Sequence, residues 1–181
     1  MASAVPDGVV VRTASVADTG ALAAIGSSSF RDAYAAHSAP DDLEIHLQEH
    51  FTPAAVQRAM EAGESDYLIA LVADAPSGLA KYRKQACPRP GGHDNAIEIQ
   101  QLYVLASSQG HGVGRHLVER VIEIAEQQDA AGVWLQAWEM ADWATGFYRR
   151  VGFAEIDKVS FKLGETSYVD LLMWQPLEVT Q

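Results

Sequence analysis

The strongest periodic pattern in the chain runs from Val113 to Gln127, where apolar residues return every three or four positions. That spacing places them on one face and predicts a helix with one buried side. Start and stop signals mark four further helices. These run from Ser15 toward Phe30 or Tyr34, over Asp41–His50, from Thr52 to near Gly63, and over Asp142–Val151.

Capping residues support three of these helix ends. Ser15 with Asp18 three residues later resembles a capping box, with Asp in place of the usual Glu. Thr52 and Pro53 read as an N-cap followed by proline at the first helical position. Gly152 suits the left-handed position that ends a helix.

Short runs rich in β-branched and aromatic residues predict the strands. The runs are Val9–Thr13, Tyr67–Ala73, Gly78–Arg83, Ala96–Val104, Val133–Ala137, Phe153–Phe161 and Tyr168–Trp174. Asp74–Ser77 predicts a hairpin turn between the second and third runs. The order β-α-α-α-β-β-β-α-β-α-β-β indicates an α/β fold with a mixed, mostly antiparallel sheet. We expect residues 1–8 to form a flexible tail and residues 9–181 a single domain.

The run Ala96–Val104 changes the parity of its apolar positions. Ile97 and Ile99 are odd, whereas Leu102 and Val104 are even. A regular strand keeps one face on one parity, so the change predicts a β-bulge near Gln100–Gln101. Burial of both faces would explain the same pattern, and both interpretations stay open here.

Composition and charge narrow the class of protein. The chain has 181 residues and a net charge of −11, without a Lys/Arg cluster, which argues against a nucleic-acid partner. Acidity favours cationic small molecules, although acidity that only maintains solubility is the simpler interpretation of charge alone. No apolar run is long enough to span a membrane, and the N-terminus does not resemble a signal peptide. With the single cysteine Cys87, we expect a cytoplasmic protein.

A glycine-rich segment lies between the fourth strand and the Val113–Gln127 helix, with Gln109-Gly110-His111-Gly112-Val113-Gly114 at its centre. Glycines at such a place let several N–H groups face one point beside the positive end of the helix dipole, which suits a pyrophosphate. Arg115 stands where a dinucleotide fingerprint needs glycine, and Gly114-Arg115-His116 fails the Walker pattern. By itself the spacing is equally explained by a tight turn before a helix.

Three segments in order carry a family resemblance. Gln109-x-x-Gly112-x-Gly114 resembles the phosphate-binding signature of GCN5-related N-acetyltransferases (GNAT), Leu102-Tyr103-Val104 resembles that family's fourth-strand ending, and Ala144-x-x-Phe147-Tyr148-x-x-x-Gly152-Phe153 resembles its late helix and turn. Trp138-Glu139, the stretch from Phe30 to Phe51 and the ending Leu163–Met173 are similar to PaiA-type polyamine N-acetyltransferases.

The resemblance implies the single-domain GNAT fold, with a mixed sheet of about seven strands, helices on its faces and a bulge in strand 4. It implies acetyl-CoA as co-substrate and no metal, and no spacing in the chain reads as a metal site. The cofactor-binding residues it implies are Leu102, Tyr103, Val104, Gln109, Gly110, His111, Gly112, Val113, Gly114, Arg115, His116, Tyr148 and Arg150. Solvated surface arginines remain the alternative for Arg115 and Arg150.

The resemblance also implies catalytic roles. Tyr148 matches the family's catalytic tyrosine and is the expected general acid. The alternative is a helix tyrosine that only packs on the core. Glu98 lies six residues before Val104 and is the expected base, acting through water. The alternative is an exposed carboxylate on a strand without a catalytic role. Phe30, Tyr34 and Glu98 are the expected substrate-binding residues, with core packing as the alternative for the two rings. Ala141 stands where the family often carries asparagine, so one polar contact is missing.

Three functions remain open for the chain. The first is acetylation of a small primary amine such as spermidine or spermine. The second changes the acceptor to a protein N-terminus, an amino acid or an amine drug. The third is a CoA-binding regulatory module without catalysis. A homodimer is common in the family, and the sequence does not decide the oligomeric state.

Overall fold

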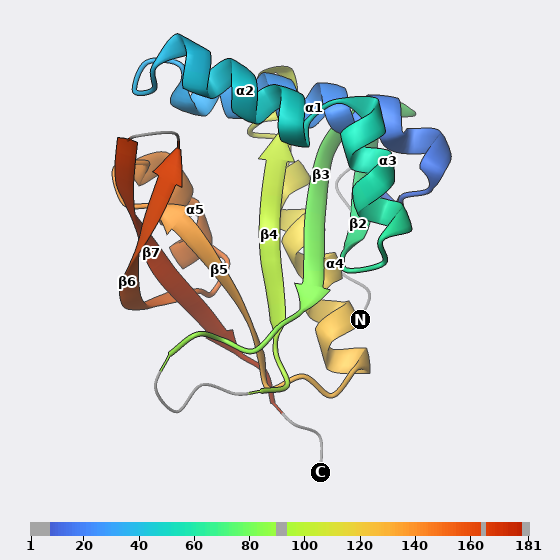
Figure 1. Cartoon of the computed structure of the whole chain (residues 1–181). Helices are drawn as coiled ribbons and strands as arrows, with labels where there is room; N and C mark the ends of the chain where they lie inside the picture. The colour runs from blue at the N-terminus through green and yellow to red at the C-terminus, as the bar shows by residue number, and fades with distance from the viewer. Residues whose placement is uncertain (1–7, 90–93, 164–165, 179–181) are drawn as a thin grey trace. The chain divides into compact units, whose positions relative to one another are not determined.

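The computed structural model describes residues 8–89, 94–163 and 166–178. Its seven strands form one sheet with the order β1-β2-β3-β4-β5-β7-β6. Figure 1 traces the helices and strands along the chain. The predicted α/β fold with a mixed seven-stranded sheet and flanking helices is therefore confirmed. The chain divides into two compact units, residues 1–81 with 101–120 and residues 82–100 with 121–181, which we describe separately. Of the predicted tail, residues 1–7 lie outside the described residues, and the single-domain boundary 9–181 stays a prediction.

The first unit contains β1, α1–α3, β2, most of β3 and the start of α4. The elements are β1 (Val9–Thr13), α1 (Thr19–Tyr34), α2 (Pro40–His50), α3 (Pro53–Glu61), β2 (Asp66–Val72), β3 (Ala75–Lys84) and α4 (Val113–Gln127). Apolar residues of α1, α3 and two strands pack into one core, with Leu22, Ile25, Val56, Ile69 and Leu79 at most 3% exposed. β1 and β2 pair antiparallel, with Val9 opposite Val72. Each helix and strand predicted here is present.

The two predicted N-terminal caps of the first unit, at Ser15 and Thr52, are both present. The Ser15 N–H donates to Asp18 Oδ2 at 2.8 Å, and a 3-10 turn at Val16–Asp18 leads into α1. Thr52 Oγ1 accepts from the Ala55 N–H at 3.2 Å at the start of α3. Each side chain satisfies a helix N–H that has no intrahelical partner. Local sequence therefore fixes where α1 and α3 begin.

The hairpin between β2 and β3 is tighter than predicted. The turn is Ala73–Asp74 rather than Asp74–Ser77, because β3 already begins at Ala75. Both turn residues have positive φ, 46° and 63°. Two consecutive left-handed residues match the right-handed twist of the flanking strands. Alanine is uncommon at such a position, so the local pattern does not indicate that the turn begins at Ala73.

Gly78 on β3 lets α4 begin close to the strand. A side chain there would come within 2.8 Å of Val113 Cγ1 and 3.0 Å of the Tyr103 carbonyl oxygen. The Leu105 N–H donates to the Ser77 carbonyl at 3.0 Å, which holds the end of β4 beside β3. Since Val113 is the first residue of α4, this contact sets the position of the helix N-terminus.

The second unit contains β5 (Gly132–Trp138), α5 (Asp142–Arg150), β6 (Ala154–Leu163), β7 (Thr166–Pro176) and the first half of β4 (Ile97–Val104). β4 and β5 are parallel, and their register joins Ile97–Ile99 to Val133–Leu135. β7 pairs antiparallel with β5 and with β6. As predicted, Gly152 after α5 has positive φ, 107°.

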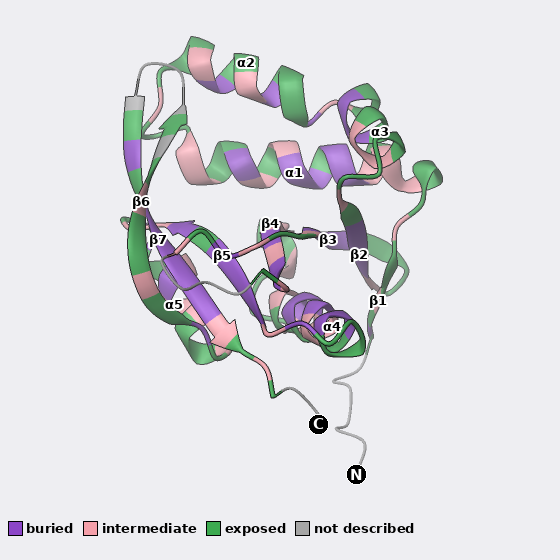
Figure 2. Cartoon of the chain, turned by 60° about the horizontal axis from the view of Figure 1, so that its bottom comes forward, coloured by how far each residue is buried: buried purple, intermediate pink, exposed green. Residues whose placement is uncertain are grey.

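The core of the second unit joins Cys87 and Ala96 to Trp134, Leu172 and Trp174, all at most 6% exposed. Figure 2 shows β5 and β7 as largely buried strands. Gly132 lies against Trp174, because a side chain at this glycine would come within 2.3 Å of the indole ring. The register of β6 with β7 shifts between Glu155 and Asp157. The bulge predicted near Gln100–Gln101 in β4 is tested by no register pair and stays a prediction.

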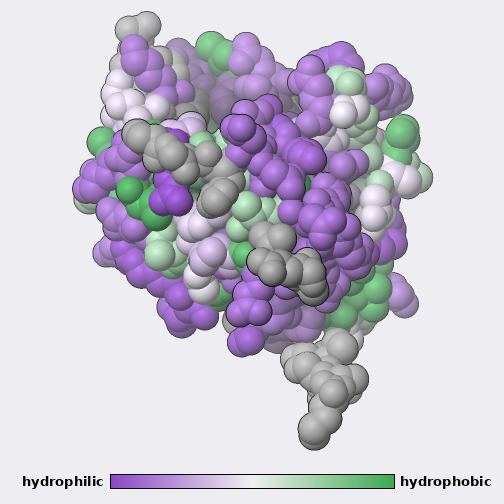
Figure 3. All heavy atoms as spheres, turned by 90° about the horizontal axis from the view of Figure 1, so that it is seen from below, coloured by the Kyte–Doolittle hydropathy of each residue, from purple (hydrophilic) through white to green (hydrophobic). Residues whose placement is uncertain are grey.

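On the face drawn in Figure 3, hydrophilic side chains predominate and hydrophobic ones form small scattered groups. Among the described residues, no helix has the length and apolar character needed to cross a bilayer.

Candidate active site

The glycine segment predicted from the sequence forms the turn into α4. Gly110 and Gly112 both have φ of +80°, which L side chains rarely adopt. The turn begins after a 3-10 helix at Ala106–Ser108 and ends at Val113, which is 1% exposed and anchors the helix in the core. The two glycines therefore meet a backbone requirement that another residue would strain.

The turn places several backbone N–H groups beside the start of α4. Val113, Gly114 and Arg115 are the first three residues of the helix, so their N–H groups have no helical acceptor before them. The next N–H, that of His116, donates to the Gly112 carbonyl at 3.0 Å and starts the helical ladder. A run of unpaired N–H groups at a helix N-terminus is a site for phosphate oxygens. The segment therefore fits the pyrophosphate of CoA.

Side chains of the segment hold its shape. Gln109 Nε2 donates to the Val104 carbonyl at 3.3 Å, which ties the loop to the end of β4. His111 Nδ1 lies 3.0 Å from the Gln109 carbonyl, and His116 Nδ1 lies 2.8 Å from the Gly112 carbonyl. Both imidazoles thus contact the backbone of the loop. No group of three or more His, Cys, Asp or Glu side chains among the described residues is arranged to hold a metal ion.

The remaining cofactor residues expected in the first unit lie next to this loop along the chain. Leu102, Tyr103 and Val104 end β4 and are half-buried. The Tyr103 ring meets Phe51 edge to face, with centroids 5.8 Å apart. Arg115 forms an ion pair with Glu119 at 2.7 Å, and its side chain is 69% exposed. A phosphate would have to compete with this exposed, weak pair.

Glu98 lies in the second unit and is not an exposed carboxylate. Its side chain is 12% exposed, and Oε2 accepts a hydrogen bond from Arg83 Nε at 2.5 Å. Arg83 is a partner that the sequence analysis missed, because the two residues are on different strands. The guanidinium fixes one carboxylate oxygen and leaves Oε1 for a water or an amine.

Tyr148 lies in the last turn of α5. Its ring makes edge contacts with Phe147 at 5.2 Å and Phe153 at 5.9 Å, and it is half-buried. The Phe153 N–H donates to the Tyr148 carbonyl at 3.0 Å. Two aromatic neighbours therefore restrict the ring, and part of the residue stays exposed. Arg150, at the end of α5, is exposed.

Ala141 begins α5 and is 6% exposed. As the N-cap, it provides no side-chain hydrogen bond to the first turn of the helix. An asparagine here would supply an acceptor, so the departure from the family pattern removes one polar group from the start of α5.

Phe30 and Tyr34 stack on each other on α1, with ring centroids 4.4 Å apart. Phe30 also stacks on His46 of α2 at 4.4 Å and is only 4% exposed. Burial, followed by the neighbouring His50, lowers the pKa of His46 to about 4. Phe30 is therefore a packing residue between α1 and α2, and Tyr34 is the more accessible of the two rings expected to bind substrate.

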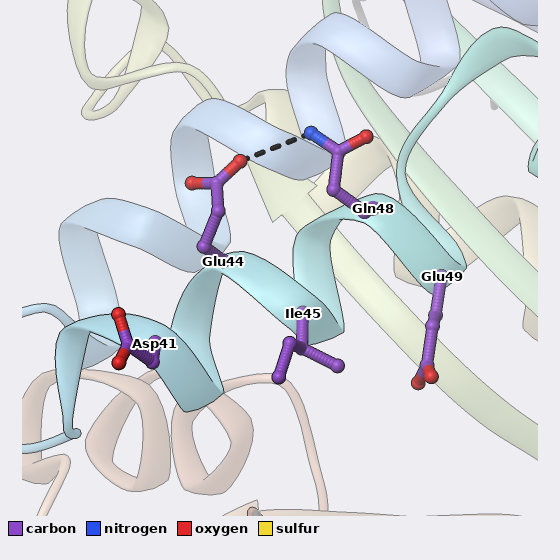
Figure 4. A pocket seen from close by; sticks show the side chains of 5 residues that line it. All are labelled: Asp41, Glu44, Ile45, Gln48 and Glu49. Carbon is purple, nitrogen blue, oxygen red and sulfur yellow. Dashed lines mark hydrogen bonds between the residues drawn. The ribbon is translucent and has the colours of Figure 1, made fainter.

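A shallow pocket lies on the outer side of α2 and contains none of the predicted residues. Figure 4 shows its five lining side chains, Asp41, Glu44, Ile45, Gln48 and Glu49. Gln48 Nε2 donates to Glu44 Oε1 at 3.0 Å, and Glu44 also pairs with Arg31 at 2.9 Å. All five side chains come from one helix, so the hollow is a solvated acidic surface rather than an enclosed site.

Asp170 on β7 is a buried carboxylate that the sequence analysis did not assign to the site. It is 7% exposed, and its Oδ1 has no hydrogen-bond partner among the described residues. Burial raises its pKa to about 6. The available signal was a single charged residue inside the apolar run Tyr168–Trp174.

Comparisons with known proteins agree on the family. The sequence profile of the acetyltransferase (GNAT) family matches residues 27–153. An uncharacterised N-acetyltransferase from Lactobacillus delbrueckii subsp. lactis is 24% identical over 170 residues, which cover 94% of this chain and 98% of that protein.

Two solved structures are similar in fold. The PaiA N-acetyltransferase from Thermoplasma acidophilum, solved in complex with coenzyme A, has a TM-score of 0.75 and 17% identity and covers 93% of this chain and 99% of its own. The ribosomal-protein-alanine N-acetyltransferase from Brucella melitensis has a TM-score of 0.68 and 23% identity with the same coverage.

Proposed function

The chain belongs to the GNAT acetyltransferase family, and from this membership we propose that it moves the acetyl group of acetyl-CoA to a primary amine of a small molecule. The observation that supports the proposal is the turn with two left-handed glycines, Gly110 and Gly112, which leads directly into the N-terminus of α4. Such a turn recognises the phosphates of the donor and carries no information about the acceptor.

The reaction sets three requirements. An alkyl amine resembles lysine, with a pKa near 10.4, so only roughly one molecule in a few thousand is neutral at pH 7. A base must remove the proton before the nitrogen attacks the thioester carbon. The carbonyl oxygen gains negative charge, and the departing thiolate benefits from a proton.

Glu98 is the proposed base, acting through a water molecule. Its Oε2 is held by Arg83, so Oε1 is the atom that would accept the proton relayed from the amine. Its side chain is mostly buried, which restricts the positions that a relaying water can take.

Tyr148 is the proposed acid. A phenol can donate its proton to the sulfur as the carbon–sulfur bond breaks and the new carbon–nitrogen bond forms. The contacts with Phe147 and Phe153 restrict the ring, which supports a positioned donor over a freely rotating one. The backbone N–H of Val104 is the proposed donor to the thioester oxygen.

A thiol-release assay with the full chain tests this proposal. Acetyl-CoA is incubated with spermidine, spermine, simple amines, amino acids and short peptides, and CoA release is recorded. We expect Tyr148→Phe to lower kcat about 100-fold or more. Tyr67→Phe removes the same oxygen from a tyrosine that is 5% exposed on β2 and should keep kcat.

Three results would contradict parts of the assignment. Tight CoA binding without turnover on any amine would leave a regulatory CoA-binding module. Full kcat in Tyr148→Phe across the pH range would remove this tyrosine from the acid step. Glu98→Gln should change the pH–rate profile, and an unchanged profile would mean that another group accepts the proton.

A further inference from the structure

Asp170 is a buried carboxylate whose Oδ1 has no partner among the described residues, and the reaction proposed above does not use it. It lies in the middle of β7 and is 7% exposed, and its Oδ1 is buried without a hydrogen bond from any described residue. A buried carboxylate normally has two or more donors, because losing water without replacement is unfavourable. The missing partner is therefore the feature to explain.

Aromatic rings flank this carboxylate. Trp138 of β5 is directly opposite Asp170 in the antiparallel register, and Val159 of β6 is opposite on the other side. Tyr168, two residues earlier on β7, points to the same face, and its ring meets Trp138 edge to face at 5.6 Å. The register therefore places two aromatic residues next to this carboxylate, and the π faces of aromatic rings attract organic cations.

The same face of the sheet carries the proposed base. Glu98 is opposite Trp134 in the register of β4 with β5, and Trp138 follows Trp134 by four residues. Because alternate residues share a face, Glu98 and Asp170 lie on one face. Gln136, between the two tryptophans, is exposed on this face, so solvent reaches it.

Two of the cations described in the second unit are paired with other acids. Arg83 pairs with Glu98, and Lys158 pairs with Glu139 at 2.8 Å. Asp157 of β6, on the same face opposite Leu172, is a further acid. None of these groups supplies the positive charge that Asp170 lacks, so a cation from outside the protein would complete the site.

We propose that Asp170, with Trp138 and Tyr168, binds a second, non-reacting ammonium group of the acceptor, which makes the acceptor a diamine or polyamine. This inference rests on the proposed acetyl transfer. Burial raises the pKa of Asp170, which agrees with a carboxylate whose charge is not compensated until a cation binds. Ammonium binding replaces the lost water with a charge-assisted hydrogen bond.

The spacing sets the shape of the acceptor. Glu98 and Asp170 are two strands apart and four residues out of step, which in a regular sheet separates their Cα atoms by roughly 16 Å. An amine held near Glu98 must therefore extend along the face to reach Asp170. A linear polyamine meets this requirement, whereas a short alkylamine has no second charge to place there.

Matched amines test the subsite directly. Titration calorimetry in the presence of CoA measures the Kd of spermidine, 1,4-diaminobutane and n-butylamine, and CoA release gives kcat and KM for each. The diamine and n-butylamine differ by the second nitrogen. We expect Asp170→Asn to raise the Kd and KM of spermidine about tenfold to hundredfold, with kcat within about threefold and n-butylamine unchanged.

Asp157→Asn is the matched control, because it removes an equal charge from an exposed position on the same face and should leave spermidine binding intact. Trp138→Leu should weaken spermidine binding without a change of charge. The thermal transition of each variant checks that it folds.

Three results would overturn the inference: unchanged spermidine affinity in Asp170→Asn, an equal loss for n-butylamine, or a loss of kcat for all amines, which would make Asp170 a base. Spermidine binding that depends on Asp170 without any acetyl transfer would support the subsite and contradict the proposed function. Acetyl transfer to amines that does not depend on Asp170 would support the proposed function and contradict the subsite.

Discussion

Two aspartates on this chain show how surroundings set the behaviour of one side chain. Asp18 accepts hydrogen bonds from Arg12 and from the Ser15 backbone, and chiefly the Arg12 bond holds its pKa well below the usual value. Asp170 has no such donors, and burial raises its pKa to about 6. The first carboxylate stabilises the fold as an anion, whereas the second favours the folded state when protonated.

Replacing Asp170 by Asn should therefore stabilise the protein in a pH-dependent way. The folded pKa of about 6 exceeds the unfolded value near 3.9, so the favourable contribution is complete below pH 3.9 and is lost as the pH rises through 6. We expect the variant to gain about 2 kcal/mol in unfolding free energy at pH 8 and little at pH 4. Urea unfolding at both pH values measures the difference.

Asp157→Asn is again the control, because this exposed side chain should give no comparable gain. An Asp170→Asn variant that is less stable than the parent at pH 8 would mean that the carboxylate has a partner in the folded protein. A stability gain combined with weaker spermidine binding would mark Asp170 as a group kept for function at the expense of stability.

At the scale of elements, the position of α4 depends on Gly78. Gly78→Val would place methyl groups where Val113 Cγ1 and the Tyr103 carbonyl now lie. We expect a loss of about 1–3 kcal/mol in stability and a CoA affinity at least about tenfold weaker, because the N-terminus of α4 would shift. Calorimetry with CoA and thermal unfolding measure the two effects.

Gly20→Ala is the matched control, since no atom lies within 4 Å of the added methyl on α1. This substitution should keep CoA affinity and raise stability slightly. Equal CoA affinity in Gly78→Val and the parent would mean that CoA binding by the loop does not depend on how α4 packs on β3.

Elements were predictable from the sequence where one local rule decides them. The periodicity of Val113–Gln127 gave the observed limits of α4, and the Thr52 cap with Pro53 gave the start of α3. The Ala73–Asp74 turn was missed because alanine carries no signal for a left-handed backbone. Its conformation follows from the twist of two paired strands, which a local pattern does not contain.

The candidate site divides in the same way. The loop over residues 109–114 was predictable, because its glycines and the following helix are contiguous in the chain. The Arg83 partner of Glu98 and the environment of Asp170 depend on which strands are neighbours and in what register. Alternation along a strand shows which face of the sheet a residue is on, but it does not show which strand lies beside it.

The charge of the whole molecule predicts how acceptors arrive. A net charge of −11 attracts polycations over a distance that dissolved salt shortens. We expect kcat/KM for spermidine to fall several-fold between about 20 and 200 mM NaCl, and kcat/KM for n-butylamine to fall less. Initial rates at constant acetyl-CoA measure both, and equal salt dependence for the two amines would contradict long-range attraction of the polycation.

The single cysteine has a practical consequence for all of these measurements. Cys87 is 4% exposed in the core of the second unit, and burial is the main cause of its raised thiol pKa. Thiolate is the species that attacks a disulfide reagent, so the folded enzyme contributes almost no background to a colorimetric thiol titration. The amount of chromophore formed then equals the amount of CoA released. A slow reaction of one further thiol per chain would report the opening of the core around Trp134.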